Sequence, residues 1–135
     1  MKSKKLPILP AVIALIISTL TCTLLGEPTL NNVHTAKDIN GKQASASFST
    51  TDTIYVVGDL SNGVKGNVVS SKWIVSNVEG YKTGYVLAKE DFALDQDVFS
   101  YSVNFYIEPP TPAGAYKIEI YFNGVLSATI EFTVQ

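Results

Sequence analysis

An Asn-Gly pair separates two runs of alternating apolar and polar residues within positions 116–134 of the 135-residue sequence. Apolar residues occupy every second position from Tyr116 to Phe122 and again from Leu126 to Val134. A period of two is typical of a half-buried strand, and Asn-Gly tolerates the positive φ angles of a type I′ turn. Asn123-Gly124 therefore predicts a β-hairpin, in a fixed register because a slip of one residue would expose its apolar face.

Three earlier segments show the same period: Ile54–Leu60, Val68–Val75 and Val98–Ile107. In the third, one face is expected to carry Phe99, Tyr101, Val103, Phe105 and Ile107. The segment Glu108–Gly114 contains three prolines, which remove backbone donors and end the strand. Strands separated by turn signals, without a convincing helical pattern, predict one all-β domain over residues 48–135, a sandwich or a barrel.

Several motifs within residues 48–135 resemble those of a known class of domain. They are the single Trp73, a Pro-x-Gly-x-Tyr sequence at Pro112–Tyr116, an Ile-Tyr-Phe-Asn-Gly hairpin tip at 120–124 and a closing Glu-Phe-Thr-Val at 131–134. This part of the chain is similar to the immunoglobulin-like modules at the C-terminal end of many secreted or lipid-anchored prokaryotic proteins. The resemblance implies an immunoglobulin-like antiparallel β-sandwich with a non-catalytic role. The domain lacks the two sheet-linking cysteines of antibody-type domains.

Residues 1–26 have the layout of a signal peptide or membrane anchor. Three lysines lie within the first five positions and precede an apolar run at 11–25, so the chain that follows is expected to be exported. Three fates stay open: cleavage after Gly26, retention of Leu6–Leu25 as an anchor helix of about 20 residues, or lipidation of Cys22 as in bacterial lipoprotein signals. The alternative for Cys22 is a small apolar residue in an apolar segment. We expect a cell-surface, periplasmic or extracellular protein, held at the membrane if this segment is uncleaved or lipidated.

Residues 27–47 are polar and show neither a helical nor an alternating period. They include Pro28 and the turn pair Asn40-Gly41, so the sequence predicts a flexible linker between the export segment and the domain. His34, the only histidine of the chain, falls in this segment and is interpreted as a solvated side chain without a chemical role.

The ionisable residues exclude several classes of function. All ten basic residues are lysines, so no guanidinium can clamp a phosphate. Residues 27–135 carry twelve carboxylates against seven lysines, a net charge of −5 that repels polyphosphates and argues against nucleic acid as a partner. Because Cys22 and His34 both precede residue 48, the predicted domain has no thiol and no histidine to activate its hydroxyl groups, so a catalytic triad is excluded there. We therefore expect a protein that is not an enzyme, with no catalytic residue and no bound cofactor.

One acidic cluster is a candidate metal site. Asp91, Asp95 and Asp97 belong to the segment Lys89–Asp97, which is predicted to be a loop between strands. Carboxylates of a loop, with backbone carbonyl groups, are the oxygen ligands that Ca²⁺ requires. The alternative is a charged loop that its acidic side chains keep in water.

Four tyrosines are a candidate binding surface: Tyr81, Tyr85, Tyr106 and Tyr121. They are expected on loops or on the polar side of strands, where exposed rings could contact a carbohydrate or a protein. The alternative is packing across neighbouring strands, where tyrosine is favoured.

The sequence therefore predicts an exported, non-catalytic immunoglobulin-like module for adhesion, scaffolding or protein binding, whose partner is an unidentified protein or glycan. Two alternatives stay open: a structural subunit of an extracellular assembly, joined through strand edges, and a small carbohydrate-binding domain.

Overall fold

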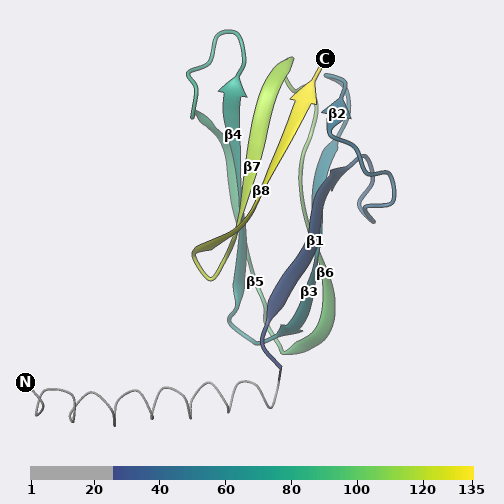
Figure 1. The fold of residues 1–135 in the computed structure, drawn as a ribbon, viewed down its shortest axis with the longest axis vertical. Helices are drawn as coiled ribbons and strands as arrows, with labels where there is room; N and C mark the ends of the chain where they lie inside the picture. Colours follow the sequence, from purple (N-terminus) through teal and green to yellow (C-terminus); the bar gives the residue numbers. More distant parts are fainter. Residues whose placement is uncertain (1–25) are drawn as a thin grey trace, which may run out of the picture.

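Two β-sheets packed face to face form the part of the chain that the computed structural model describes, residues 26–135 (Figure 1). The smaller sheet has the order β1-β3-β6, with β1 at Thr29–Ala36, β3 at Ile54–Gly63 and β6 at Val98–Ile107. The larger sheet has the order β2-β8-β7-β4-β5, formed by Ser47–Phe48 (β2), Val125–Val134 (β8), Gly114–Phe122 (β7), Val68–Asn77 (β4) and Val86–Ala93 (β5). All neighbours are antiparallel except β2 and β8.

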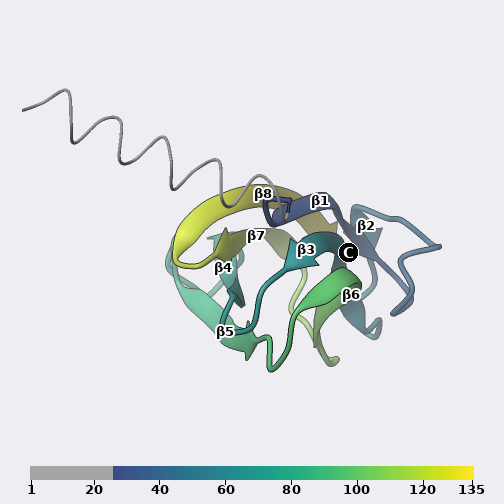
Figure 2. The same cartoon turned by 90° about the horizontal axis from the view of Figure 1, so that it is seen from below.

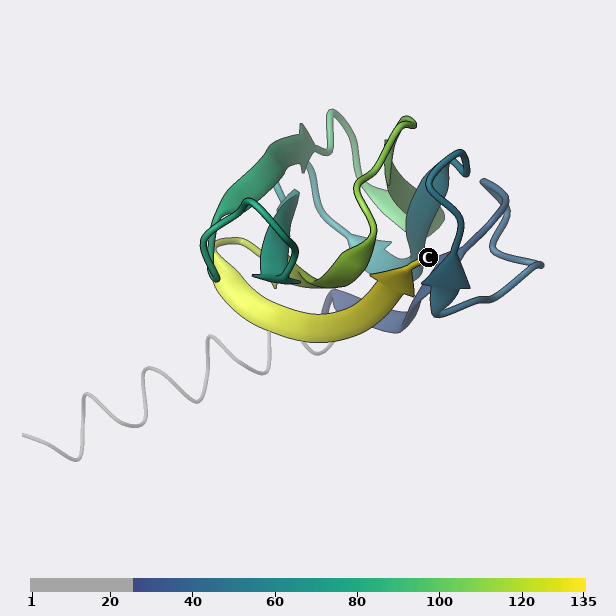
Figure 3. The ribbon, with the colours of Figure 1, turned by 90° about the horizontal axis from the view of Figure 1, so that it is seen from above.

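The end-on views show how the sheets meet. In Figure 2, β1 lies next to β8 on one side of the sandwich, and β5 and β6 lie on the opposite side. Figure 3 shows the C-terminus beside β2, which pairs with the last residues of β8. Residues 26–135 contain no helix that could cross a membrane. The predicted export segment, with Cys22, lies outside the described residues except for Gly26.

The five predicted strands are confirmed. The hairpin forms as expected, but its register shifts between Ile120 and Tyr121, and Leu126 is exposed. The runs on either side of Asn123-Gly124 form β7 and β8, and these two residues have φ angles of 50° and 81°, as a type I′ turn requires. The apolar side chains of β7 at 116, 118 and 120 are buried between the sheets.

The core is centred on Trp73 of β4, which is only 2% exposed. Its indole N–H donates a hydrogen bond to the hydroxyl of the buried Ser71 at 3.2 Å, so the polar edge of the ring is satisfied. The ring meets Phe132 of β8 edge-on, with centroids 5.9 Å apart, and Phe132 stacks on Tyr116 of β7 at 5.1 Å. These contacts join β4, β7 and β8 into one inner face.

A tyrosine corner supports the immunoglobulin-like topology. The hydroxyl of Tyr116, at the start of β7, donates a hydrogen bond to the carbonyl oxygen of Pro112. Such a bond from a tyrosine to the backbone just upstream, together with a buried tryptophan on a central strand, is a hallmark of immunoglobulin-type sandwiches. Residues 26–135 thus form an immunoglobulin-like sandwich, and they contain no cysteine.

We expect Tyr116→Phe to lower the free energy of unfolding by about 1 kcal/mol, because the carbonyl of Pro112 loses its donor. Urea unfolding followed by circular dichroism measures this change. Tyr106→Phe is the control, since that ring is half exposed, and its effect should stay below about 0.5 kcal/mol. Equal effects of the two substitutions would mean that the corner contributes nothing.

The prediction of a flexible linker over residues 27–47 is wrong. Residues 29–36 form β1, which pairs with β3 from Thr29↔Ser61 to Ala36↔Tyr55, and both Thr35 and Ala36 are buried. The strand escaped recognition because a bulge between Asn31 and His34 interrupts its alternation, with Asn32 at a φ of 56°.

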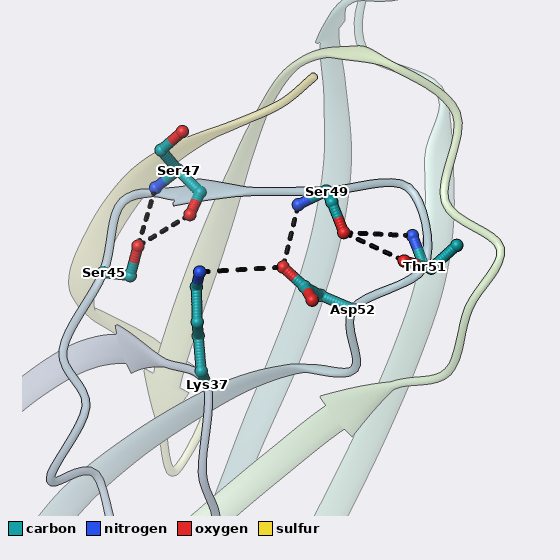
Figure 4. Close-up of polar contacts among 6 residues, drawn as sticks. All are labelled: Lys37, Ser45, Ser47, Ser49, Thr51 and Asp52. Atoms are coloured by element: carbon teal, nitrogen blue, oxygen red, sulfur yellow. Dashed lines mark hydrogen bonds and ion pairs between the residues drawn. The ribbon is translucent and has the colours of Figure 1, made fainter.

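Residues 37–53, which join β1 to β3 and include β2, are held by several polar contacts (Figure 4). The ammonium group of Lys37 lies 3.9 Å from Oδ2 of Asp52, and the same oxygen accepts the backbone N–H of Ser49 at 2.8 Å. This backbone hydrogen bond lowers the pKa of Asp52. The hydroxyl of Ser45 donates to the carbonyl of Ser47 at 2.7 Å. The folded unit therefore begins near residue 29 rather than at residue 48.

The predicted inner face of β6 is correct for only part of its length. Val103 and Phe105 are buried, but Phe99 is 88% exposed and Tyr101 is 38% exposed. Val98 packs against the core instead, opposite Gly63, where a Cβ atom would lie 2.8 Å from the Val98 side chain. The positive φ of Asn62 turns the end of β3, and the missing side chain of Gly63 leaves room for Val98.

Candidate functional site

The three candidate metal ligands do not share one loop. Asp91 lies within β5, because Lys89–Ala93 is strand rather than loop, and only residues 94–97 connect β5 to β6. Oδ1 of Asp97 accepts the backbone N–H of Lys65 at 2.8 Å, so this carboxylate braces the turn between β3 and β4. Within residues 26–135, no three His, Cys, Asp or Glu side chains gather closely enough to hold a metal ion. The aspartates therefore do not form the cage that bound Ca²⁺ would need.

The four candidate tyrosines occupy three separate places. Tyr81 and Tyr85 form a pair in the connection between β4 and β5, with ring centroids 5.4 Å apart. Tyr106 of β6 lies against Tyr55 of β3 at 5.7 Å. Tyr121 of β7 donates its hydroxyl to Oε1 of Glu119 at 2.6 Å, and this hydrogen bond raises the pKa of Tyr121. These four tyrosines therefore do not form one shared binding surface.

A polar hollow brings together one member of each candidate group. It lies on the larger sheet and is lined by Ser70, Ser71, Lys72, Lys89, Asp91, Tyr121 and Gly124. Lys72 faces Lys89 on one neighbouring strand and Glu119 on the other. Hydroxyl, ammonium and carboxylate groups that line one hollow can hydrogen-bond to a polar ligand.

Sequence reasoning missed the most unusual surface feature, the free edge of β6. Within residues 26–135, β6 pairs only with β3, so its second edge has no strand beside it. Its ten residues, Val-Phe-Ser-Tyr-Ser-Val-Asn-Phe-Tyr-Ile, include no charge, no proline and no glycine. Three of its aromatic side chains are exposed: Phe99 at 88%, Tyr101 at 38% and Tyr106 at 50%. The uncharged composition was a visible signal, but the sequence does not show which strand lies at an edge.

His34, interpreted from the sequence as a solvated bystander, holds two parts of the β1 region together. Nδ1 lies 2.8 Å from the carbonyl oxygen of Asn32, and Nε2 lies 2.9 Å from that of Gly41. Carbonyl oxygens only accept, so both hydrogen bonds form at once only when the ring is protonated. The bonds to Gly41 and Asn32 accordingly raise the pKa of His34.

The His34 contacts predict a pH-dependent stability. A pKa that folding raises contributes stability that is fully present below the unfolded-state pKa of about 6.5 and is lost as the pH rises through the folded-state value. We expect the urea midpoint of the unaltered chain, measured relative to His34→Asn, to fall when the pH rises from about 5.5 to about 8. Asparagine is the matched variant because its amide still donates a hydrogen bond but does not titrate. An identical pH dependence of the two proteins would contradict this role.

Comparisons with known proteins identify solved structures with a similar fold, but they assign the chain to no family. No family model matches the chain, and no curated protein matches its sequence. The alignment with the C-terminal domain of wzt covers 82% of this chain and 74% of the wzt chain, at 10% sequence identity and a TM-score of 0.56. Two enzymes align only through a part of their length.

The first is the Pseudomonas fluorescens alkylpurine DNA glycosylase AlkC, solved with DNA containing an abasic site analogue, at 12% identity and a TM-score of 0.53. The second is a Listeria innocua β-glucosidase in complex with glucose, at 10% identity and a TM-score of 0.51. The alignments cover 81% and 80% of this chain but only 30% and 16% of the two enzymes. What the chain shares with these proteins is a β-sandwich fold.

Proposed function

We propose that this chain is an exported, non-catalytic immunoglobulin-like module that binds another protein through the surface around β6. The observation that carries the proposal is the exposure of three aromatic side chains on one uncharged strand, with Phe99 and Tyr101 on one of its faces and Tyr106 on the other. Aromatic side chains that leave water on association dominate the energetics of protein interfaces. A phenylalanine exposed to 88% loses contact with water only when a partner covers it.

The surroundings of β6 favour binding over catalysis. Hydroxyl groups there come from Ser100, Ser102 and the two tyrosines, and the only histidine of the chain contacts Asn32 and Gly41 near β1. A histidine is the usual base that activates a hydroxyl nucleophile, and its position near β1 supports a role of this surface in recognition.

The export segment supplies the second part of the proposal. Residues 1–26 would deliver the sandwich across a membrane and, if retained or lipidated at Cys22, would hold it there. Intact mass and membrane fractionation of the protein expressed from its full-length gene test this part. A soluble product that still carries its first 26 residues would contradict both export and anchoring.

Site-specific photocrosslinking in cells that export the protein tests the binding surface. A photoreactive phenylalanine analogue replaces Phe99 or Tyr106, and Tyr85 is the control position because its exposure of 51% matches the 50% of Tyr106. We expect defined adducts with a second protein from positions 99 and 106 and none from position 85. The same adducts from all three positions, or adducts from none, would refute the proposal.

A second candidate function, glycan binding, is favoured by the polar hollow that joins Asp91 to Tyr121. Glycan-array binding by the exported protein tests it, with Asp91→Asn and Tyr121→Phe as variants. Binding that is unchanged in both variants would exclude the hollow as a sugar site.

A further inference from the structure

We infer that the free edge of β6 takes up an added strand from a partner protein, and that this partner segment is uncharged in its centre and basic at both ends. The inference rests on the proposed function and names both the interface and the partner chemistry. Strand addition satisfies the unpaired backbone groups of an edge and reads the partner through its alternating side chains.

A shallow hollow beside β6 shows that its edge is accessible. The residues that line it are Phe92 of β5 and four consecutive residues of β6, Tyr101, Ser102, Val103 and Asn104. Consecutive side chains of a strand point to opposite faces of the sheet, so one hollow can touch all four residues only along the backbone edge. The ring of Phe92 stacks on Tyr101 at 5.6 Å with an interplanar angle of 7° and so forms an apolar wall of this hollow.

The other strand edges are protected, each by a different device. The edge of β1 is interrupted by the bulge between Asn31 and His34, and β5 carries three consecutive charges, Lys89, Glu90 and Asp91. At the far side of the larger sheet, β2 has only two residues, and the rest of β8 lies beside β1 and carries Glu131. Bulges, charges and short strands are the usual means of preventing edge-to-edge pairing.

The edge of β6 has none of these protections. Its pairing with β3 runs without a shift from Ile54↔Ile107 to Ser61↔Ser100, so its backbone is regular over eight residues. A sequence without charge or proline over ten residues pairs readily with another strand. The contrast with the other edges indicates that this one is kept open for a partner.

Charges at the two ends of β6 define the partner. Asp95 and Asp97 precede the strand and Glu108 follows it, and all three are exposed. Antiparallel pairing with β6 of a second copy, Val98 against Ile107, would set Asp97 opposite Glu108 at both ends, and like charges placed opposite each other are unfavourable. A segment with lysine or arginine at its ends and uncharged residues between them matches the edge without this repulsion.

The test uses the protein isolated after export from its full-length gene and the fluorescent peptide Lys-Lys-Thr-Val-Thr-Val-Thr-Val-Lys-Lys. Fluorescence anisotropy is expected to show saturable binding, weakened about tenfold or more when glutamate replaces every lysine. Successive N–H groups of a strand point to opposite edges. Methylation of one alternate set of peptide amides should therefore abolish binding, and methylation of the other set should not.

Two variants locate the interaction. Ser102→Lys introduces a charge on the free edge and is expected to weaken peptide binding about tenfold or more. Ser127→Lys is the matched control, because Ser127 is an exposed serine of β8 in the other sheet, and it should leave binding unchanged. Native circular dichroism spectra of both variants confirm that each is folded.

The possible outcomes separate this inference from the proposed function. Strand addition would be overturned if the peptide affinity is unchanged in Ser102→Lys, or if methylation of either set of amides has the same effect. Self-association of the chain that Ser102→Lys abolishes would make a second copy the occupant and overturn the partner chemistry. If the peptide does not bind but crosslinking from position 99 persists, strand addition alone is refuted. If neither peptide binding nor crosslinking is observed, the proposed function is refuted as well.

Discussion

Replacing Trp73 with alanine is expected to lower the free energy of unfolding by about 3–5 kcal/mol. The indole is 2% exposed, contacts Phe132 edge-on and donates its N–H to Ser71 inside the core. Alanine would leave a cavity between the sheets and a buried hydroxyl without its donor. Because domains of this size are stabilised by only about 5–15 kcal/mol, such a loss removes a large part of the total.

Urea unfolding followed by far-ultraviolet circular dichroism measures this effect without depending on the lost tryptophan. The matched control is Phe99→Ala, which truncates an aromatic ring that is 88% exposed and should change stability by less than about 0.5 kcal/mol. Trp73→Phe should lie between the two, because it restores most of the apolar volume but not the hydrogen bond to Ser71. Comparable losses from Trp73→Ala and Phe99→Ala would mean that the core is not centred on the tryptophan.

The hairpin and the core could be predicted because their signals are local. A period of two around Asn123-Gly124 specifies both the strands and the turn, and Trp73 lies on the apolar face of an alternating segment that is buried as expected. Strands β1 and β5 escaped prediction because their alternation is broken, by a bulge at Asn31–His34 and by the consecutive charges Lys89, Glu90 and Asp91. Both lie at sheet edges.

The candidate site was predictable only in part, since its parts come from tertiary contacts. The exposure of Phe99 depends on the turn at Asn62 and on Gly63 of β3, more than thirty residues earlier in the chain. Whether tyrosines share a surface depends on which strands become neighbours, and the structure places Tyr106 and Tyr121 in different sheets. The free edge of β6 follows from the strand order, which the sequence does not specify.

Gly114→Ala is the second substitution with a large expected effect, a loss of about 3 kcal/mol or more in the free energy of unfolding. Gly114 begins β7 at a φ of 147°, which L-amino acids rarely adopt. A Cβ atom there would lie 2.5 Å from the carbonyl oxygen of Asn77 and 2.7 Å from the side chain of Val78, at the end of β4. The strained backbone and the steric clash both lower the free energy of unfolding of the variant.

Gly124→Ala separates these two contributions. Gly124 also has a positive φ, 81°, but a Cβ atom there would meet no atom within 4 Å. The strain of a left-handed alanine alone costs about 1–2 kcal/mol, so we expect Gly124→Ala to remain clearly more stable than Gly114→Ala. Thermal or urea unfolding of the two variants beside the unaltered chain measures the difference. A Cβ atom at position 114 would clash with the backbone of β4 next to the tyrosine corner. Equal stabilities of the two variants would therefore show that the close approach of β4 and β7 at Gly114 does not contribute to the stability of the fold.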